Sequence, residues 1–272
     1  MTQPPTGDPP VREPVATDPA FDPARIKAVA FDGYGTIFDF ANRDFHVAVT
    51  SILAEQRIET DIDAFFQTWV SSSNKASVWS AARVNDQRAD PDVMMNGPLP
   101  GWHSTWETWR RQFDIAFEHY NLQGDGAAAA DYLRHALSHV EPYPDAHDTI
   151  DMLARRGYLV ALLSNADEDF LQSALSRARL RFSIIQSSES LRAYKPHRAI
   201  FAALCARASY EPHEILYVGD SANADVSGAQ NAGLATAWVR RDDRPYPERM
   251  GPPSVVVDQL AELLPVLTGV TS

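Results

Sequence analysis

Short apolar runs rich in β-branched residues alternate with amphipathic helical patterns, and this alternation constrains the fold more than any other feature of the chain. It begins at residues 26–38 and resumes over residues 143–270. Strands that alternate with helices predict a parallel sheet with helices on both faces, which is an α/β fold. The predicted strands are Ala28–Phe31, Leu159–Leu163, Phe182–Gln186, Ile215–Val218, Leu234–Val239 and Ser254–Val257. The predicted helices between them are Ala146–Arg156, Asp169–Ala178, His197–Ala206, Asp225–Ala232 and Gln259–Leu267.

Residues 41–140 lack this alternation and instead repeat apolar residues at helical spacing. The stretches "NRDFHVAVTSILAEQ", "DAFFQTWVSS" and "STWETWRRQFDIAFEHYNL" carry the pattern. We therefore predict a helical domain over residues 41–140, inserted after the first strand of a core made of residues 25–40 and 141–272. Residues 1–24 are rich in proline and poor in large apolar side chains, which predicts a flexible tail.

The charge of the chain limits its partners. With 36 acidic and 24 basic side chains, the formal net charge is −12. Sequence-independent binding to nucleic acid needs a basic surface, so we expect no nucleic-acid partner. No apolar stretch approaches the roughly 20 residues of a membrane-spanning helix, so we expect no membrane partner. The single cysteine, Cys205, allows no disulfide within the chain, which suits a cytoplasmic protein, and we expect a monomer or a homodimer.

Four polar clusters follow predicted strands. In chain order they contain Asp32, then Ser164 and Asn165, then Lys195, then Asp220 and Asp225. The carboxyl ends of parallel strands lie at one edge of a sheet, and ligands of such sheets bind beyond that edge. The joint placement of the clusters therefore predicts a functional site at this edge.

The first two clusters have an ordinary structural interpretation beside the functional one. Asp32 could cap the turn formed with Gly33 and Gly35. It could also be a nucleophile, like the carboxylates that form an aspartyl-phosphate. Ser164 and Asn165 could cap the helix that follows, or could donate hydrogen bonds to an anionic group of a small-molecule substrate.

The stretch that contains Asp220 and Asp225 is the most specific. Asp220 ends a strand, and Asp225 lies five residues later at the start of a helix. Two carboxylates so placed suit a hard divalent cation such as Mg²⁺, although the helix dipole alone would account for Asp225. Lys195 either lies in solvent, as most lysines do, or is held at the strand end, where it would offset the carboxylates and a bound anion.

The elements "FDGYGT", "LLSN", "KP" and "VGDSANADVSGAQNAG", in this order and spacing, resemble the haloacid dehalogenase superfamily from about residue 25 onwards. The resemblance implies a Rossmann-like core with the first strand central and a helical cap domain that moves over the site. It implies that Asp32 forms a covalent aspartyl intermediate. Ser164, with Asn165 beside it, would bind the transferred group, and Lys195 would hold Asp32 and that group in place.

The resemblance also implies a metal site. Mg²⁺ would be bound by Asp32, Asp220 and the main-chain carbonyl of Tyr34, and Asp225 would support the metal cluster. Thr36 would hydrogen-bond near the nucleophile and tighten the turn.

Two motifs favour different reactions within this superfamily. Phosphatases usually carry a second Asp, the general acid and base, where this chain has Tyr34; the D-x-Y-G-T form is typical of 2-haloacid dehalogenases, which need no metal. The stretch "GDSANAD" is instead the metal-binding phosphatase form, and Phe201 stands where a dehalogenase would carry Tyr. Tyr34 could itself donate a proton, although its reference pKa near 10 makes it a poor base.

These motifs predict a hydrolase that uses an aspartate nucleophile and Mg²⁺ on a small phosphorylated metabolite. The alternative is the hydrolysis of an L-2-haloacid without metal. A second alternative is a protein of the same fold that binds a partner and has no catalytic activity.

Overall fold

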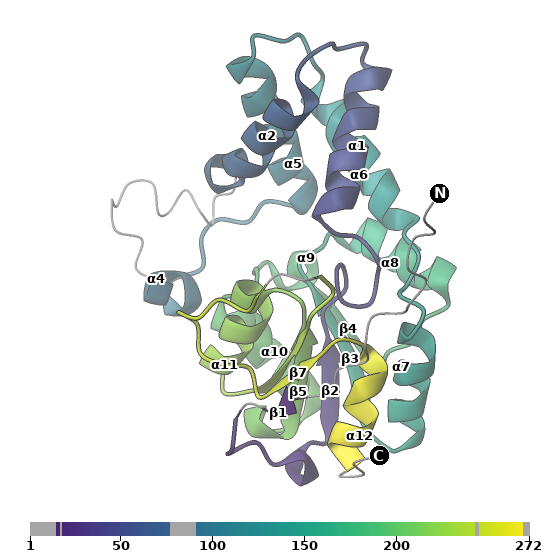
Figure 1. The fold of residues 1–272 in the computed structure, drawn as a ribbon. Coiled ribbons are helices and arrows are strands. Elements are labelled where there is room, and N and C mark those ends of the chain that lie inside the picture. The colour runs from purple at the N-terminus through teal and green to yellow at the C-terminus, as the bar shows by residue number, and fades with distance from the viewer. Residues whose placement is uncertain (1–14, 17, 77–90, 243–244, 269–272) are drawn as a thin grey trace, which may run out of the picture.

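The sheet of the predicted α/β core is present. The computed structural model describes residues 15–16, 18–76, 91–242 and 245–268. The strands within them are β1 (Val15–Ala16), β2 (Ala28–Phe31), β3 (Leu159–Ser164), β4 (Ile184–Ser187), β5 (Ile215–Gly219), β6 (Ala235–Val239) and β7 (Val255–Val257). They form one sheet in the order β1-β7-β6-β5-β2-β3-β4 (Figure 1). Strand β1 is antiparallel to β7 and all other neighbours are parallel, so the predicted fold class is confirmed.

Strand β2 lies between β3 and β5, so the first strand of the core is central. Its Ala28 is in register with Leu159 of β3 and with Ile215 of β5. All its residues are buried, because strands cover both of its edges and helices cover both of its faces. The predicted strands agree with the observed ones to within two residues at each end. The carboxyl ends of β3, β2 and β5 therefore lie side by side at one edge of the sheet.

Helices cover both faces of the sheet (Figure 1). They are α7 (Ala146–Arg155), α8 (Glu168–Ala178), α9 (Ser188–Leu191), α10 (Arg198–Ala208), α11 (Gly228–Asn231) and α12 (Leu263–Thr268), with short turns η1 (Pro23–Arg25), η2 (Pro212–Glu214), η3 (Ala222–Ser227) and η4 (Leu260–Glu262). Side chains alternate across β2: Val29 and Phe31 belong to an apolar cluster with residues of α7, α8 and α12. Ala28 and Ala30 belong to a second cluster with residues of α10 and α11.

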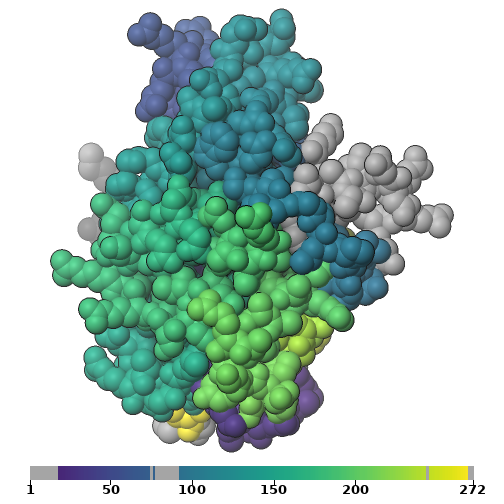
Figure 2. Space-filling model, turned by 180° about the vertical axis from the view of Figure 1, so that it is seen from behind, coloured from purple at the N-terminus to yellow at the C-terminus, as the bar shows by residue number. Residues whose placement is uncertain are grey.

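The described part of the chain between β2 and α7 is helical. It forms α1 (Asn42–Glu55), α2 (Ile62–Ala76), α4 (Pro91–Asn96), α5 (Thr105–His119) and α6 (Gly126–Ser138). We call residues 41–140 the helical insertion. Helices α1, α2, α5 and α6 stand beyond one end of the sheet (Figure 1), whereas α4 lies against the core beside α10 (Figure 1 and Figure 2). That the helical insertion is a separate, mobile cap with these boundaries stays a prediction.

The helical insertion has an apolar interior that continues into the core. Phe65, Phe113 and Leu133 are fully buried, and they belong to the same cluster as Phe31 of β2. No helix among the described residues combines the length and the apolar character that a membrane span requires.

Part of the predicted flexible tail is ordered. Val15–Ala16 pairs with β7, and Pro23–Arg25 forms a 3-10 turn. Strand β7 would otherwise be the edge of the sheet, and its unpaired backbone groups favour a further strand. A strand of two residues has no periodicity that a sequence can reveal. Residues 15–16 and the turn that begins at Pro23 thus belong to the ordered core; residues 1–14 lie outside the described chain, and the flexible tail stays a prediction.

We expect Phe31→Ala to lower the free energy of unfolding by about 3–5 kcal/mol, because the side chain is fully buried in the central strand and its loss leaves a cavity. Chemical denaturation measures this change. The control is Val47→Ala on α1, whose side chain is 63% exposed and which should change the stability by less than about 0.5 kcal/mol. Equal effects of the two changes would contradict the placement of β2 at the centre.

Candidate active site

The predicted polar clusters meet at the carboxyl edge of the sheet. Asp32 follows β2, and its backbone N–H continues the ladder to the carbonyl of Val218 in β5 at 2.9 Å. Ser164 is the last residue of β3, and Asp220 follows β5. The register of the three parallel strands thus brings residues far apart in the sequence to one point.

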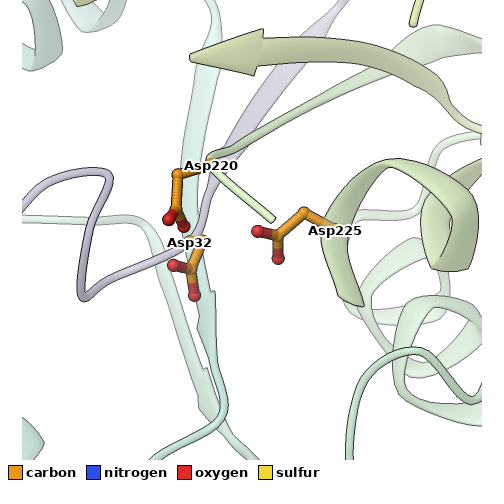
Figure 3. Close-up of side chains that lie close together, drawn as sticks. All are labelled: Asp32, Asp220 and Asp225. Carbon is orange, nitrogen blue, oxygen red and sulfur yellow. The ribbon is translucent and has the colours of Figure 1, made fainter. Parts of the chain in front are cut away.

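Three carboxylates face one another at this point. One oxygen from each of Asp32, Asp220 and Asp225 lies within 4.8 Å of the other two, and Figure 3 shows the side chains converging. Asp32 and Asp225 are buried. Asp225 belongs to η3, a π-helical turn, and its Oδ2 accepts a hydrogen bond from Ser221 N at 2.9 Å. The wide turn replaces the first part of the regular helix predicted from Asp225 onwards, and such turns are frequent at functional sites.

Lys195 bridges two of these carboxylates. Its Nζ lies 2.5 Å from Asp32 Oδ1 and 2.6 Å from Asp225 Oδ1, and it is buried. Burial alone would lower the pKa of Lys195, but the charges of Asp225 and Asp32 outweigh it and hold that pKa well above its usual value. Of the two interpretations of Lys195, the solvated side chain is therefore wrong.

The charges of the cluster do not balance. With all three carboxylates ionised and Lys195 protonated, the cluster has a net charge of −2, and Asp220 forms no ion pair with a described residue. Burial and the charges of Asp225 and Asp32 raise the pKa of Asp220 to about 8. Burial likewise raises the pKa of Asp225 to about 6, although Lys195 opposes the shift. Buried charge of one sign is unfavourable without a counter-ion.

The cluster fits a divalent cation. Its candidate ligands are all carboxylate oxygens, which hard cations such as Mg²⁺ prefer. The charge that Lys195 leaves uncompensated equals that of one such ion. Asp32, Asp220 and Asp225 are therefore suited to hold Mg²⁺; the part predicted for the carbonyl of Tyr34 stays a prediction.

Two glycines allow the carboxylates to come this close. Gly35 has φ +90°, a conformation that residues with a side chain rarely adopt, and a Cβ there would lie 2.8 Å from Asp220 Oδ2. A Cβ at Gly219 would lie 2.3 Å from Asp225 Cγ. Only glycine fits at either position without moving a carboxylate.

Ser164 and Asn165 reach the same site. Ser164 Oγ donates to Asp32 Oδ1 at 3.3 Å. The Asn165 amide pairs with the backbone of Lys195: its Oδ1 accepts from Lys195 N at 2.9 Å and its Nδ2 donates to Lys195 O at 3.2 Å. Asn165 therefore holds the lysine loop and keeps a second amide N–H. That these residues bind the transferred group stays a prediction.

Tyr34 lies near the nucleophile, but its side chain is directed away from the site. The Tyr34 hydroxyl donates to the carbonyl of Leu137 in α6 at 3.2 Å, and its ring packs against Phe38 and Phe170. Burial raises the pKa of Tyr34, and the charge of Asp32 raises it further. In this conformation Tyr34 is not a proton donor to the site, because apolar packing turns its hydroxyl towards the helical insertion.

Thr36 hydrogen-bonds in the loop through its main chain and not through its side chain. It is fully buried, and its Oγ1 has no hydrogen-bond partner among the described residues. The tight turn closes through the backbone, since Thr36 N, Ile37 N and Phe38 N all donate to Gly33 O. The Thr36 carbonyl accepts from Arg241 Nη2 at 2.8 Å, so Thr36 contributes to the loop through its main chain.

Two residues of the site were not predicted. Tyr217 of β5 accepts a hydrogen bond from Lys195 Nζ at 3.0 Å; a polar aromatic residue inside the buried run "ILYVG" was the available signal. Asp167 directly precedes α8, but its side chain makes no capping bond to that helix. Its carboxylate accepts instead from the backbone N–H groups of Thr105 and Trp106, at 2.8 and 2.9 Å, at the start of α5.

Known proteins of two kinds are similar to this chain. It matches the profile of the haloacid dehalogenase-like hydrolases over residues 26–233. It is 29% identical to (S)-2-haloacid dehalogenase 4A of Burkholderia cepacia over 89% of this chain and 95% of that protein. It is 27% identical to a phosphoglycolate phosphatase of Haemophilus influenzae over 89% of this chain and 99% of that protein. The structure of L-2-haloacid dehalogenase from Xanthobacter autotrophicus superposes with a TM-score of 0.68, at 24% identity, over 90% of this chain and 100% of that one.

We expect Gly219→Ala to weaken Mg²⁺ binding by about tenfold or more, because the new Cβ displaces the carboxylate of Asp225; tenfold corresponds to about 1.4 kcal/mol. Isothermal titration calorimetry measures the affinity. Gly101→Ala is the matched control, since a Cβ at Gly101 meets no atom within 4 Å and should leave the affinity unchanged. A folded Gly219→Ala variant with unchanged Mg²⁺ affinity would contradict the role of Asp225.

Proposed function

The chain belongs to the haloacid dehalogenase-like hydrolase family, as its motifs predicted, and we propose that it is a Mg²⁺-dependent hydrolase of the phosphatase type, acting on a small phosphorylated metabolite. In this proposal Asp32 is the nucleophile, and Asp32, Asp220 and Asp225 hold the metal. Relatives of both kinds match over most of the chain at similar identity, so the choice between the reactions depends on the site itself.

The third carboxylate, Asp220, is the observation that carries the proposal. Lys195 offsets only one of the three negative charges in the cluster. In a reaction without metal, an ionised Asp220 would oppose both the ionised nucleophile and an anionic substrate, and an Asp220 kept protonated by its raised pKa would have no role. With Mg²⁺ bound, Asp220 becomes a ligand, and the metal would neutralise charge on the phosphoryl oxygens.

Asp32 is held ready for nucleophilic attack. The hydrogen bonds from Lys195 and Ser164 both go to its Oδ1, and described residues donate none to Oδ2. We therefore assign Oδ2 as the attacking oxygen. Its bond to phosphorus forms as the bond from phosphorus to the leaving oxygen breaks, which gives an aspartyl-phosphate. Water then attacks the phosphorus, releases inorganic phosphate and restores the Asp32 carboxylate.

The leaving group should need little protonation. Tyr34 occupies the position at which phosphatases carry their second Asp. The Tyr34 hydroxyl donates its proton to Leu137 O. General acid assistance typically raises the reaction rate by about 10²–10⁴-fold, and the hydrolysis of a substrate with a poor leaving group would lose this rate. Acyl phosphates, anhydrides and phosphonates lose less of the rate when the general acid is absent, so we propose substrates with leaving groups of this kind.

A cytoplasmic location remains part of the proposal.

The dehalogenase alternative is supported by the D-x-Y-G-T stretch and by the similarity to (S)-2-haloacid dehalogenases. A halide leaves without a proton, so Tyr34 would be no disadvantage. Hydrolysis of the ester intermediate would then need a base, for which Asp225 is the candidate. The alternative leaves Asp220 without a role. A binding protein without activity is disfavoured further, because the complete charged cluster is retained.

We expect EDTA to abolish hydrolysis of acetyl phosphate and p-nitrophenyl phosphate, and Mg²⁺ to restore it. Asp220→Asn, which keeps the shape but removes a charged ligand, should lower the activity by about 10²-fold or more. Asp151→Asn is the control, because that residue lies on α7 with its side chain 64% exposed, and its activity should not change. Activity that survives removal of the metal would overturn the proposal.

We expect no halide release from chloroacetate, bromoacetate or fluoroacetate, because an ionised Asp220 repels the carboxylate of these substrates and a protonated Asp220 does not assist the reaction. Ion chromatography detects the halide, and Asp32→Asn controls for release that does not use the nucleophile. Halide release that persists in EDTA and disappears in Asp32→Asn would establish the dehalogenase instead.

A further inference from the structure

The hydroxyl of Tyr217 lies against the ammonium of Lys195 inside the protein. The O–N distance is 3.0 Å, and the side chain of Tyr217 is buried. Tyr217 is on the face of β5 that packs against α10, where its ring meets Phe201 edge to face at 5.1 Å between centroids. The ring is therefore fixed by apolar packing, and only its hydroxyl reaches the polar site.

The direction of this hydrogen bond is fixed. The single proton of the Tyr217 hydroxyl goes to the carbonyl of Leu163 at 2.7 Å. The hydroxyl oxygen can therefore only accept from Lys195, whose ammonium has donors and no acceptor. Leu163 directly precedes Ser164 in β3, so this bond also ties β5 to the strand that carries Ser164.

The donors of Lys195 are all used. An ammonium has three N–H groups, and three acceptors surround Nζ: Asp32 Oδ1 at 2.5 Å, Asp225 Oδ1 at 2.6 Å and Tyr217 Oη at 3.0 Å. Rotation of the ammonium about its stem would break all three bonds. No N–H is left over for a fourth partner.

We propose that Tyr217 is a positioning residue: it is the third acceptor of Lys195, holds the ammonium on Asp32 and Asp225, and leaves Lys195 no N–H to donate to the substrate. The proposal rests on the proposed function, because it concerns the same nucleophile. It differs from the role implied by the family resemblance, in which Lys195 also holds the transferred group. That task falls to other donors, such as the remaining amide N–H of Asn165.

Tyr217→Phe separates these roles. The variant keeps the ring packed on Phe201 but frees one N–H and lets the ammonium turn away from Asp32. We expect kcat for acetyl phosphate to fall about tenfold while KM stays within about twofold, since the substrate loses no contact. A rise in KM at unchanged kcat, or no change in either, would overturn the proposal.

Tyr158→Phe is the matched control. Tyr158 also donates its hydroxyl proton to a backbone carbonyl, that of Leu267 at 3.2 Å, but it directly precedes β3, at the opposite end of that strand from Ser164, and does not contact Lys195. The control loses the same kind of bond, so its kinetics should equal those of the unaltered protein. Thermal unfolding of both variants shows whether they are folded.

A second measurement needs no variant at Tyr217. In protein labelled with ¹⁵N-lysine, a slowly exchanging ammonium signal that is absent from Lys195→Met identifies Lys195. With Mg²⁺ and inorganic phosphate bound, we expect no scalar coupling between this nitrogen and the phosphorus. An observed coupling would show that Lys195 donates to the ligand and would overturn the proposal.

The two proposals fail in different ways. If the unaltered protein lacks Mg²⁺-dependent phosphatase activity, the proposed function fails, and the exchange rate of the ammonium signal then tests Tyr217 by itself. In Tyr217→Phe that exchange should become faster, and an unchanged rate would overturn the positioning role.

Discussion

The buried ion pairs of Lys195 with Asp32 and Asp225 are the interactions on which the active site depends. Transfer of isolated charges into a protein interior is strongly unfavourable, and ion pairs offset this only when the geometry is good and the remaining donors are satisfied. These ion pairs therefore form only if both the backbone and the ammonium of Lys195 are held in a fixed position. Its backbone is held there by Asn165, and its ammonium by the two carboxylates and Tyr217. These partners of Lys195 lie in β5 and η3 or directly follow β2 and β3. A slip in the register of any of the three strands would therefore break some of these bonds.

The same loops carry contacts to the helical insertion. Asp167, two residues after Asn165, accepts the first backbone N–H groups of α5. Tyr194, directly before Lys195, donates its hydroxyl proton to the carbonyl of His103 at 3.1 Å. Carboxylates at helix N-termini are favourable because unpaired N–H groups and the helix dipole meet there. The start of α5 thus rests on the two loops that hold the lysine, and a displacement of the insertion would act on Lys195 through only a few bonds.

The sequence predicted those features that depend on strand periodicity. Asp32 and Asp220 end apolar runs, and in a parallel sheet this alone places them at the same edge. The side-chain directions of Tyr34 and Asp167 could not be predicted in this way. Tyr34 turns towards Leu137, 103 positions away in the chain, because Phe38 and Phe170 surround its ring. Asp167 caps a helix of the insertion and not its own, and only the tertiary fold brings α5 to it. Tyr217 was missed because its run is typical of a buried strand, in which a tyrosine normally serves packing.

The charge of the cluster also limits the order of events in catalysis. With all three carboxylates ionised, as a metal site requires, its four charged side chains sum to −2 before any substrate enters. A phosphate monoester brings up to two further negative charges and a haloacid brings one, so either anion meets repulsion at such a site. Lys195 is already bound to three acceptors among the described residues. In the proposed reaction, a divalent cation bound before or together with the substrate would supply the positive charge that admits the anion. Asp220, the carboxylate that Lys195 does not reach, carries this part of the proposal, and it therefore separates the two candidate reactions better than the loop around Tyr34 does.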